Sequence, residues 1–213
     1  HVPMARAALH AGKAVFIEKP LSLEPLEARS LLSLARRRRR LVLVDHIHLF
    51  HPAYQGLKRL GGRLGPLRFI ESAGGNRGPF RRDTPPLWDY GPHDVAMALD
   101  LAGEVPSEVR ARREHAEDLP AGRGEVWRIE LRFPGGIRAR LRVGNLLARK
   151  SRRLKASFEG GVAVYDDLAR RKLTLRRAAG LRTVPVAPAP PLTLALKAFV
   201  AGFPQSAMLN DAK

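Results

Sequence analysis

Two short apolar runs on either side of a helical segment constrain the fold of this chain most strongly. Residues 14–17 and 41–44 are apolar at successive positions, which is typical of strands buried on both faces of a parallel sheet. Residues 22–38 predict a helix, because Ser22 can cap its start and apolar side chains then recur at helical spacing. Strand, crossover helix and strand together predict a parallel βαβ unit.

The predicted parallel sheet is small for a fold of this kind. A short helix at residues 3–11 precedes it, and only two strands belong to it. Two parallel strands leave two open edges and cannot bury both faces. We therefore expect this α/β part to be the C-terminal part of a doubly wound parallel sheet whose first strands are absent.

The pattern changes to α+β after about residue 50. Residues 126–133 and 137–143 alternate between apolar and polar side chains around Pro134-Gly135-Gly136, which predicts a β-hairpin with arginines on its outer face. Further strands are predicted at 67–73, 154–158, 162–165 and 172–175, and helices at 52–60, 88–101 and 192–203. We expect an open, mostly antiparallel sheet with helices on one face, and two domains, residues 1–50 and 51–213.

Composition excludes several classes of protein. The chain has 213 residues, a net charge of +18 and no Cys, so a disulfide scaffold, a thiolate zinc site and a Cys nucleophile are excluded. No apolar run is long enough to cross a membrane, and residues 1–13 lack the order of a signal peptide, so a cytoplasmic location is expected. The positive charge suggests an anionic partner, but a bias toward Arg at exposed positions is the favoured explanation.

The carboxyl ends of the two parallel strands form the first candidate site. Glu18-Lys19-Pro20 follows the first strand, and Asp45, His46 and His48 follow the second. Ligands of doubly wound folds lie at this end of the sheet. The simpler interpretation of Glu18 and Lys19 is a solvated loop pair. The Lys19–Pro20 bond is also a candidate for a cis peptide.

Asp89 and His93 form the second candidate site. They lie four residues apart at the start of a predicted helix, so their side chains can meet on one face. A carboxylate beside an imidazole is the arrangement of an oriented general base. The alternative is a helix-capping Asp89 and a helix-end His93.

Other motifs carry less weight. His46, His48 and His51 lack the accompanying ligands of a familiar metal site, so no metal is expected. The glycine clusters at 61–65 and 74–78 do not have the spacing of a dinucleotide-binding fingerprint.

Two segments resemble signatures of one known family. Residues 11–21, AGKAVFIEKPL, and residues 89–94, DYGPHD, resemble the AGKhVxxEKPL and D-x-G-x-H-D motifs of the glucose–fructose oxidoreductase, inositol dehydrogenase and rhizopine-catabolism (Gfo/Idh/MocA) family. Trp88 and residues 164–167 resemble a branch that contains sugar and nucleotide-sugar dehydrogenases. The resemblance covers nearly the whole chain.

The resemblance implies a Rossmann domain with bound NAD or NADP and a dehydrogenase that acts on a sugar, cyclitol or nucleotide-sugar hydroxyl. It implies that Lys19, Asp89 and His93 are catalytic: Lys19 contacts the reacting hydroxyl, Asp89 binds substrate or orients His93, and His93 accepts the proton. Glu18, Lys19 and Pro20 are then the cofactor-binding residues. A homo-oligomer is expected, with no specific nucleic acid and no membrane as partner.

Relative to the family pattern, the chain starts after the glycine-rich turn, and it ends where another helix is expected. We therefore expect a truncated chain that by itself holds NAD(P) weakly. The first alternative is a catalytically inactive remnant that serves oligomerisation or protein contact. The second is a nucleic-acid-binding module that uses the arginine face of the hairpin. It is disfavoured, because Trp127 and Phe133 lie on the opposite face.

Overall fold

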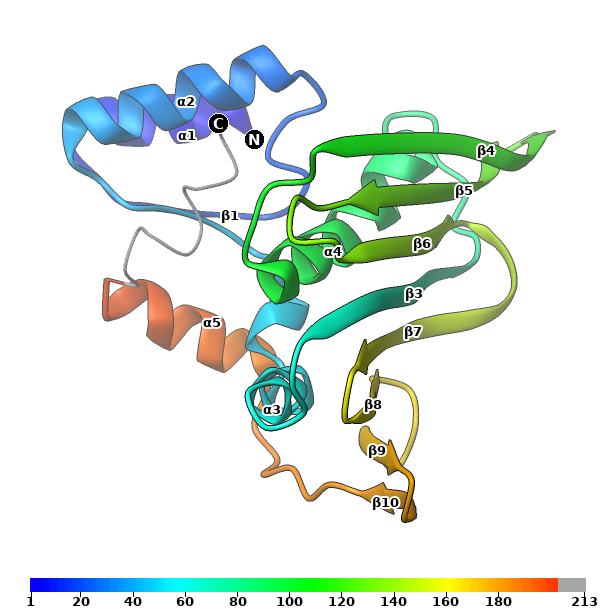
Figure 1. The fold of residues 1–213 in the computed structure, drawn as a ribbon. Helices are drawn as coiled ribbons and strands as arrows, with labels where there is room; N and C mark the ends of the chain where they lie inside the picture. The colour runs from blue at the N-terminus through cyan, green and yellow to red at the C-terminus, as the bar shows by residue number, and fades with distance from the viewer. Residues whose placement is uncertain (203–213) are drawn as a thin grey trace. The chain divides into compact units, whose positions relative to one another are not determined.

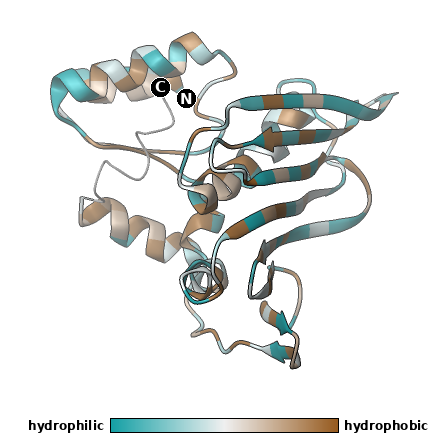
Figure 2. Cartoon of the chain, viewed as in Figure 1, coloured by the Kyte–Doolittle hydropathy of each residue, from teal (hydrophilic) through white to brown (hydrophobic). Residues whose placement is uncertain are grey.

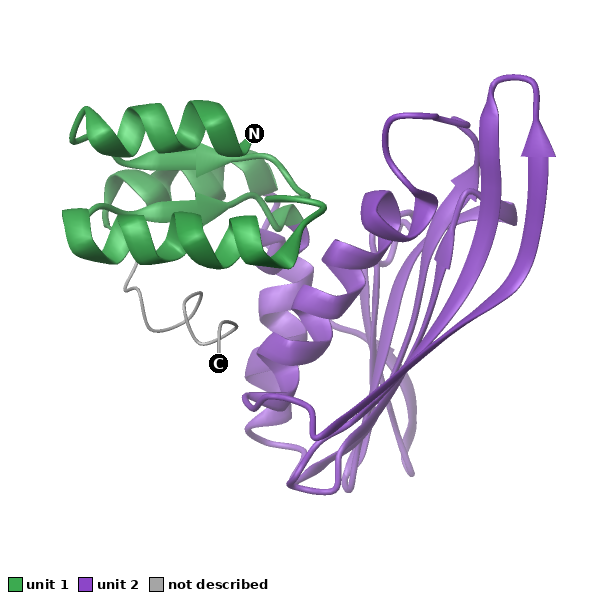
Figure 3. Ribbon diagram, turned by 90° about the horizontal axis from the view of Figure 1, so that it is seen from above, with its two compact units in different colours: residues 1–47, 190–213 green, residues 48–189 purple. Residues whose placement is uncertain are grey.

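The computed structural model describes residues 1–202, which form two compact units (Figures 1 and 3). One unit holds residues 1–47 together with the described residues from Pro190 onward, and the other holds residues 48–189. The sequence predicts a division after residue 50 and places the last helix in the second domain. In the structure that helix groups with the first unit.

The first unit contains the parallel βαβ element predicted from the sequence. Strands β1 and β2 pair in parallel, with Phe16 opposite Leu43. Its elements are α1 (Val2–His10), β1 (Val15–Ile17), α2 (Pro25–Arg38), β2 (Val42–Val44) and α5 (Pro191–Val200). Leu9, Leu31 and Ile17 are buried in a core of this unit's own. The rings of Phe16 and Phe199 meet edge to face with centroids 5.7 Å apart, so α5 packs against β1.

The second unit is built on one eight-stranded sheet with the strand order β10-β9-β8-β7-β3-β6-β5-β4. Every neighbouring pair is antiparallel except β3 and β6, which are parallel. The strands are β3 (Leu67–Arg77), β4 (Glu108–Leu119), β5 (Gly122–Arg132), β6 (Arg138–Gly144), β7 (Leu146–Phe158), β8 (Gly161–Asp166), β9 (Leu173–Arg177) and β10 (Gly180–Thr183). The predicted open, mostly antiparallel sheet is confirmed.

Two helices pack on one face of this sheet. The helical elements are the short 3-10 helix η1 (Ile47–Phe50), α3 (Pro52–Gly61) and α4 (Pro86–Ala102). Helix α4 packs against β3, β5 and β6, and α3 packs against β8 and β9 (Figure 1). The alternation of apolar and polar residues along the central strands is visible in Figure 2. It places Leu131, Leu141 and Leu154 in a core beneath the helices.

The predicted hairpin has the expected register. Ile129 lies opposite Leu141, and Leu131 lies opposite Ala139. These side chains are buried, while Arg128 and Arg142 lie opposite each other on the other face. The turn at Gly136 has φ +82°, a conformation that glycine adopts without strain.

Candidate active site

Helix α4 positions the two residues of the second sequence motif. The helix begins at Pro86, and its N-cap residue is Pro85, whose carbonyl accepts the backbone N–H of Asp89 at 3.1 Å. Asp89 therefore lies in the first turn and is not the cap, and His93 lies one turn further on rather than at the helix end. The alternative interpretation of this pair as a cap and a helix-end histidine is wrong.

His93 lies against a second histidine. The ring centroids of His93 and His48 are 5.0 Å apart, and the two ring planes are perpendicular. His48 lies in η1, and its Nδ1 is 2.8 Å from the hydroxyl of Tyr165 on β8. The structure thus brings together three side chains from three distant parts of the sequence.

Burial sets the protonation of the His48–Tyr165 pair. Tyr165 is fully buried, and burial raises its pKa far above the ordinary value, with Asp167 adding to the effect. Burial also lowers the pKa of His48 to about 4, although the nearby Asp167 opposes this shift. Near pH 7 the phenol is therefore protonated and the imidazole neutral, so the two groups share one neutral hydrogen bond between the Tyr165 hydroxyl and Nδ1 of His48.

Asp167 lies beside this pair and interacts with two basic side chains. Nε2 of His51 lies 3.2 Å from its carboxylate, and Nη1 of Arg152 lies 3.3 Å away. The hydrogen bond from His51 is the main reason that the pKa of Asp167 lies well below its usual range. Nδ1 of His51 accepts the backbone N–H of Ala53 at 3.0 Å, which leaves the ring proton on Nε2 to face Asp167.

Asp94 follows His93 and faces the sheet. It is buried, and burial raises its pKa to about 7. A Cβ atom at Gly74 on β3 would collide with Oδ2 of Asp94. Glycine at this position therefore makes the room that the carboxyl group of Asp94 occupies.

The first unit presents ionisable groups where β1 and β2 end. Glu18, Lys19 and Pro20 directly follow β1, and the Lys19–Pro20 bond is cis as anticipated. The backbone N–H of Asp45 donates to the carbonyl of Ile17 at 2.7 Å, which keeps the two strand ends together.

The groups at these two strand ends also interact electrostatically. Asp45 is buried, and its pKa is raised by burial and by Glu18. The pKa of His46 is lowered to about 4 by burial and by the charge of Lys19. His46 and His48 do not belong to one strand, because β2 ends at Val44 and His48 lies in η1.

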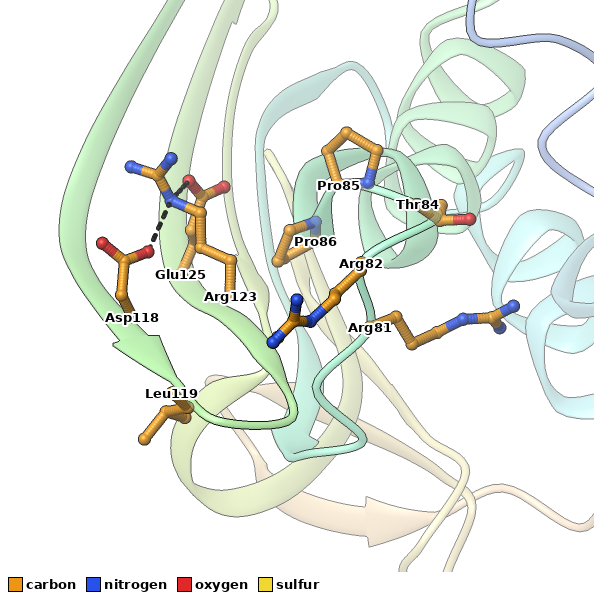
Figure 4. Close-up of a pocket in the computed structure, with 10 residues that line it drawn as sticks. Arg81, Arg82, Thr84, Pro85, Pro86, Asp118, Leu119, Arg123 and Glu125 are labelled. Atoms are coloured by element: carbon orange, nitrogen blue, oxygen red, sulfur yellow. Dashed lines mark ion pairs between the residues drawn. The ribbon is translucent and has the colours of Figure 1, made fainter.

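A cavity of about 490 Å³ opens beside the start of α4 (Figure 4). Arg81, Arg82 and Arg123 line it. Each of these arginines is engaged: Arg81 binds Asp83 at 2.8 Å, Arg82 donates to the carbonyl of Pro120, and Arg123 lies 2.9 Å from Glu125. The charged groups of these arginines are therefore already paired within the protein.

Within residues 1–202, no group of three or more His, Asp or Glu side chains could hold a metal ion. No helix in that same range is long and apolar enough to cross a membrane.

Some of these residues could not be found from the sequence motifs. Tyr165 and Asp167 belong to a segment that the resemblance singled out, but nothing in it indicates a contact with His48, 117 residues away. The burial of Asp94 likewise follows only from the packing of α4 on β3.

The fold and this arrangement of side chains define a class of protein, an α/β unit joined to a large open sheet whose helical face carries paired imidazoles. The model of an oxidoreductase family with an NAD-binding Rossmann fold matches residues 1–46. A crystal structure of a candidate oxidoreductase from Magnetospirillum magnetotacticum superimposes with a TM-score of 0.87 and 34% identity, over 94% of this chain and 68% of that one.

Relatives with a named activity are also similar. The UDP-N-acetylglucosamine 3-dehydrogenase of Acidithiobacillus ferrooxidans is 30% identical over 88% of this chain and 58% of its own length. A crystal structure of that enzyme superimposes with a TM-score of 0.80 at 27% identity, over 96% of this chain and 67% of that one. The chain belongs to the Gfo/Idh/MocA oxidoreductase family. It spans less than two thirds of the length of the curated relatives it matches. The expected family and its NAD-binding character are confirmed.

Proposed function

We propose that this chain serves an NAD(P)-dependent dehydrogenase that oxidises a hydroxyl group of a sugar, a cyclitol or a nucleotide sugar. The observation that carries the proposal is the placement of His93 on α4, one turn beyond Asp89 and against the neutral imidazole of His48. An imidazole held on a helix beside a neutral imidazole suits a proton acceptor near neutral pH. The similarity to a UDP-N-acetylglucosamine 3-dehydrogenase favours a nucleotide sugar.

The residues after β1 fit the nicotinamide end of such a cofactor. Glu18, Lys19 and Pro20 lie at the carboxyl end of a parallel strand, where doubly wound folds bind dinucleotides. Lys19 supplies a cation there, and its charge reaches His46. When bound, the nicotinamide ring supplies the hydride acceptor.

Each proposed catalytic residue has a separate task. His93 accepts the proton of the substrate hydroxyl as the hydride leaves the carbon atom that bears this hydroxyl. Lys19 stabilises the negative charge that develops on that oxygen. Asp89 binds the substrate or orients His93 from the preceding turn.

The test is hydride transfer by the natural protein that carries these residues. UDP-N-acetylglucosamine, free N-acetylglucosamine and myo-inositol are offered with NAD or NADP, and formation of reduced nicotinamide is followed by absorbance. His93→Asn and Lys19→Met are expected to lower turnover by about two to four orders of magnitude, the usual range for an acid–base group.

The matched controls replace the same residue types elsewhere. His115 is exposed on β4 and Lys13 is exposed before β1, so His115→Asn and Lys13→Met should leave turnover unchanged. Near-full turnover in His93→Asn would exclude His93 as the proton acceptor. Absence of turnover with every substrate, in a folded protein that binds NADH, would contradict the dehydrogenase proposal.

A further inference from the structure

Tyr165 is a buried hydroxyl group that the proposed proton transfer does not use. It is fully buried on β8, at the end of the sheet covered by α3. Its hydroxyl lies 2.8 Å from Nδ1 of His48. Its ring also packs against those of His51 and Tyr54, at centroid distances of 5.0 and 6.1 Å. Aromatic neighbours on several sides therefore hold this phenol in one position.

This hydrogen bond holds the ring of His48. A protonated phenol and a neutral imidazole can each donate or accept, and with either tautomer the bond joins Nδ1 of His48 to the Tyr165 hydroxyl. A bond at one ring nitrogen restricts the rotation of the His48 ring. That ring is the one that meets His93 perpendicularly at 5.0 Å.

We propose that His48, held at Nδ1 by the Tyr165 hydroxyl, is a positioning residue that sets the ring orientation of His93. The inference rests on the proposed function of His93 as proton acceptor. A perpendicular ring at this distance restricts rotation of the His93 imidazole, so that its accepting nitrogen stays aimed in one direction. General-base efficiency depends on such alignment, and misplacement by about 1 Å can lower a rate by about a hundredfold.

The surroundings of His48 keep its imidazole in one protonation state near neutral pH. Burial lowers the pKa of His48 most, Arg152 and His51 lower it further, and together they outweigh Asp167, which favours the charged imidazole. His48 therefore stays neutral well below pH 7, with a pKa of about 4. Neither Tyr165 nor His48 therefore changes its protonation state near pH 7, and the pair should not make the activity depend on pH in that range.

The first experiment reads the histidine rings directly and needs no activity. In the protein labelled with ¹⁵N at histidine, ring nitrogen shifts report the tautomer and surroundings of each imidazole. Tyr165→Phe removes the hydrogen-bond partner of Nδ1, so it should change the ring nitrogen shifts of His48 and should shift the ring signals of His93. Tyr54→Phe is the matched control: Tyr54 is also a fully buried tyrosine, but its hydroxyl bonds Asp100 and the carbonyl of Met97.

The second experiment separates alignment from loss of structure. His48→Asn keeps an amide group near the place of Nδ1, which can accept from or donate to the Tyr165 hydroxyl, whereas His48→Leu keeps only volume. We expect kcat to fall about ten- to a hundredfold in Tyr165→Phe and His48→Leu, with KM changed less than about twofold. His48→Asn should recover part of that loss.

The outcomes distinguish this inference from the proposed function. Unchanged His93 ring signals in folded Tyr165→Phe and His48→Leu proteins would overturn the positioning role, even if the enzyme is active. Equal shifts in Tyr54→Phe and Tyr165→Phe would overturn it as well, because a general loosening of the core would then explain both. If the signals move as expected but no variant or parent shows hydride transfer, the positioning stands and the dehydrogenase proposal fails.

Discussion

The two faces of the eight-stranded sheet carry opposite chemistry. On the helix-covered face, β6 contributes the buried side chains of Ala139, Leu141 and Val143. On the open face the alternate residues of the same strand are arginines at 138, 140 and 142. One short strand thus faces a dry core on one side and water on the other, and the cost of a substitution should depend on the face more than on the strand.

Polar side chains interact differently on the two faces. Beneath the helices a few polar side chains have specific partners, such as the Tyr54 hydroxyl with Asp100 at 2.6 Å. On the open face, basic and acidic side chains pair across strands, as in Lys155 with Glu71 at 2.6 Å and Arg142 with Glu114 at 2.8 Å. Buried hydrogen bonds are costly to break, whereas exposed ion pairs contribute little each. The helix-covered face should therefore hold most of the unit's stability.

The largest expected effect comes from a cavity on the helix-covered face. Leu141 is fully buried opposite Ile129, so Leu141→Ala should lower the free energy of unfolding by about 2–5 kcal/mol. Val109, which is 59% exposed on the edge strand β4, provides the control. Val109→Ala should stay within about 0.5 kcal/mol of the parent. Urea unfolding measures both. Val109 lies opposite Leu131 and so on the same face, but at the exposed edge of the sheet, so equal losses would show that burial beneath the helices does not set the cost of a substitution.

The same contrast explains which strands the sequence can predict. The hairpin of β5 and β6 is predictable because each strand buries one face, which produces a clean alternation of apolar and polar residues. Strand β4 is not among the predicted strands. It is an edge strand in which every residue from 108 to 119 is partly or fully exposed, so no alternation marks it. The first half of β7 lacks a signal for the same reason, since residues 148–150 are all exposed.

The candidate site is predictable only in part. Lys19, Asp89 and His93 stand in short local motifs, which mark chemistry without showing contacts. The neighbours of His93 come from tertiary structure: His48 reaches Tyr165 across 117 residues of sequence, and Asp94 finds its place at Gly74 through the packing of α4 on β3. No local pattern encodes contacts of this range.

The second expected effect is overpacking beneath α4. A Cβ atom at Gly74 would collide with Oδ2 of Asp94, so Gly74→Ala should lower the free energy of unfolding by about 1–3 kcal/mol. Adding Asp94→Ala to the Gly74→Ala protein should restore part of the lost unfolding free energy. Gly62→Ala is the control, because its nearest contact would be 3.7 Å away. If Gly74→Ala is as stable as Gly62→Ala in thermal unfolding, Asp94 is not confined as described.

A smaller effect should appear as a pH dependence of Asp94. Its pKa is raised by burial from 3.8 to about 7. Between these values the folded protein keeps a proton that the unfolded chain has released, so this contribution to stability falls as pH rises. The contribution is complete below about pH 4 and gone above about pH 7, with a slope of at most about 1.4 kcal/mol per pH unit.

The Asp94→Asn variant isolates this titration from those of the other carboxyl groups. Its side-chain amide cannot ionise, so the difference in unfolding free energy between the parent protein and Asp94→Asn should move against the parent as pH rises from about 4 to about 7. Urea titrations at several pH values measure that difference. A difference that stays constant across the window would mean that Asp94 is ionised in the folded protein.

The smallest effect is expected on the open face. Arg138 and Arg140 lie over the ring of Phe69, each 5.9 Å from its centroid, and Arg142 pairs with Glu114. Replacing all three with Gln should leave the hairpin intact and lower the free energy of unfolding by about 1 kcal/mol or less, since exposed pairs are individually weak and Glu114 keeps its bond to Arg128.

The same triple variant tests what the arginines do for partners. Any binding to a polyanion such as heparin should be weak, fall steeply with salt, and show a shallower salt dependence after the three substitutions, because fewer counterions are then displaced. Fluorescence titration at several salt concentrations measures the slope. Binding that resists salt and selects one nucleic-acid sequence would show that the open face recognises a ligand. An unfolding penalty as large as that of Leu141→Ala would instead show that the charged face supports the fold as much as the apolar one.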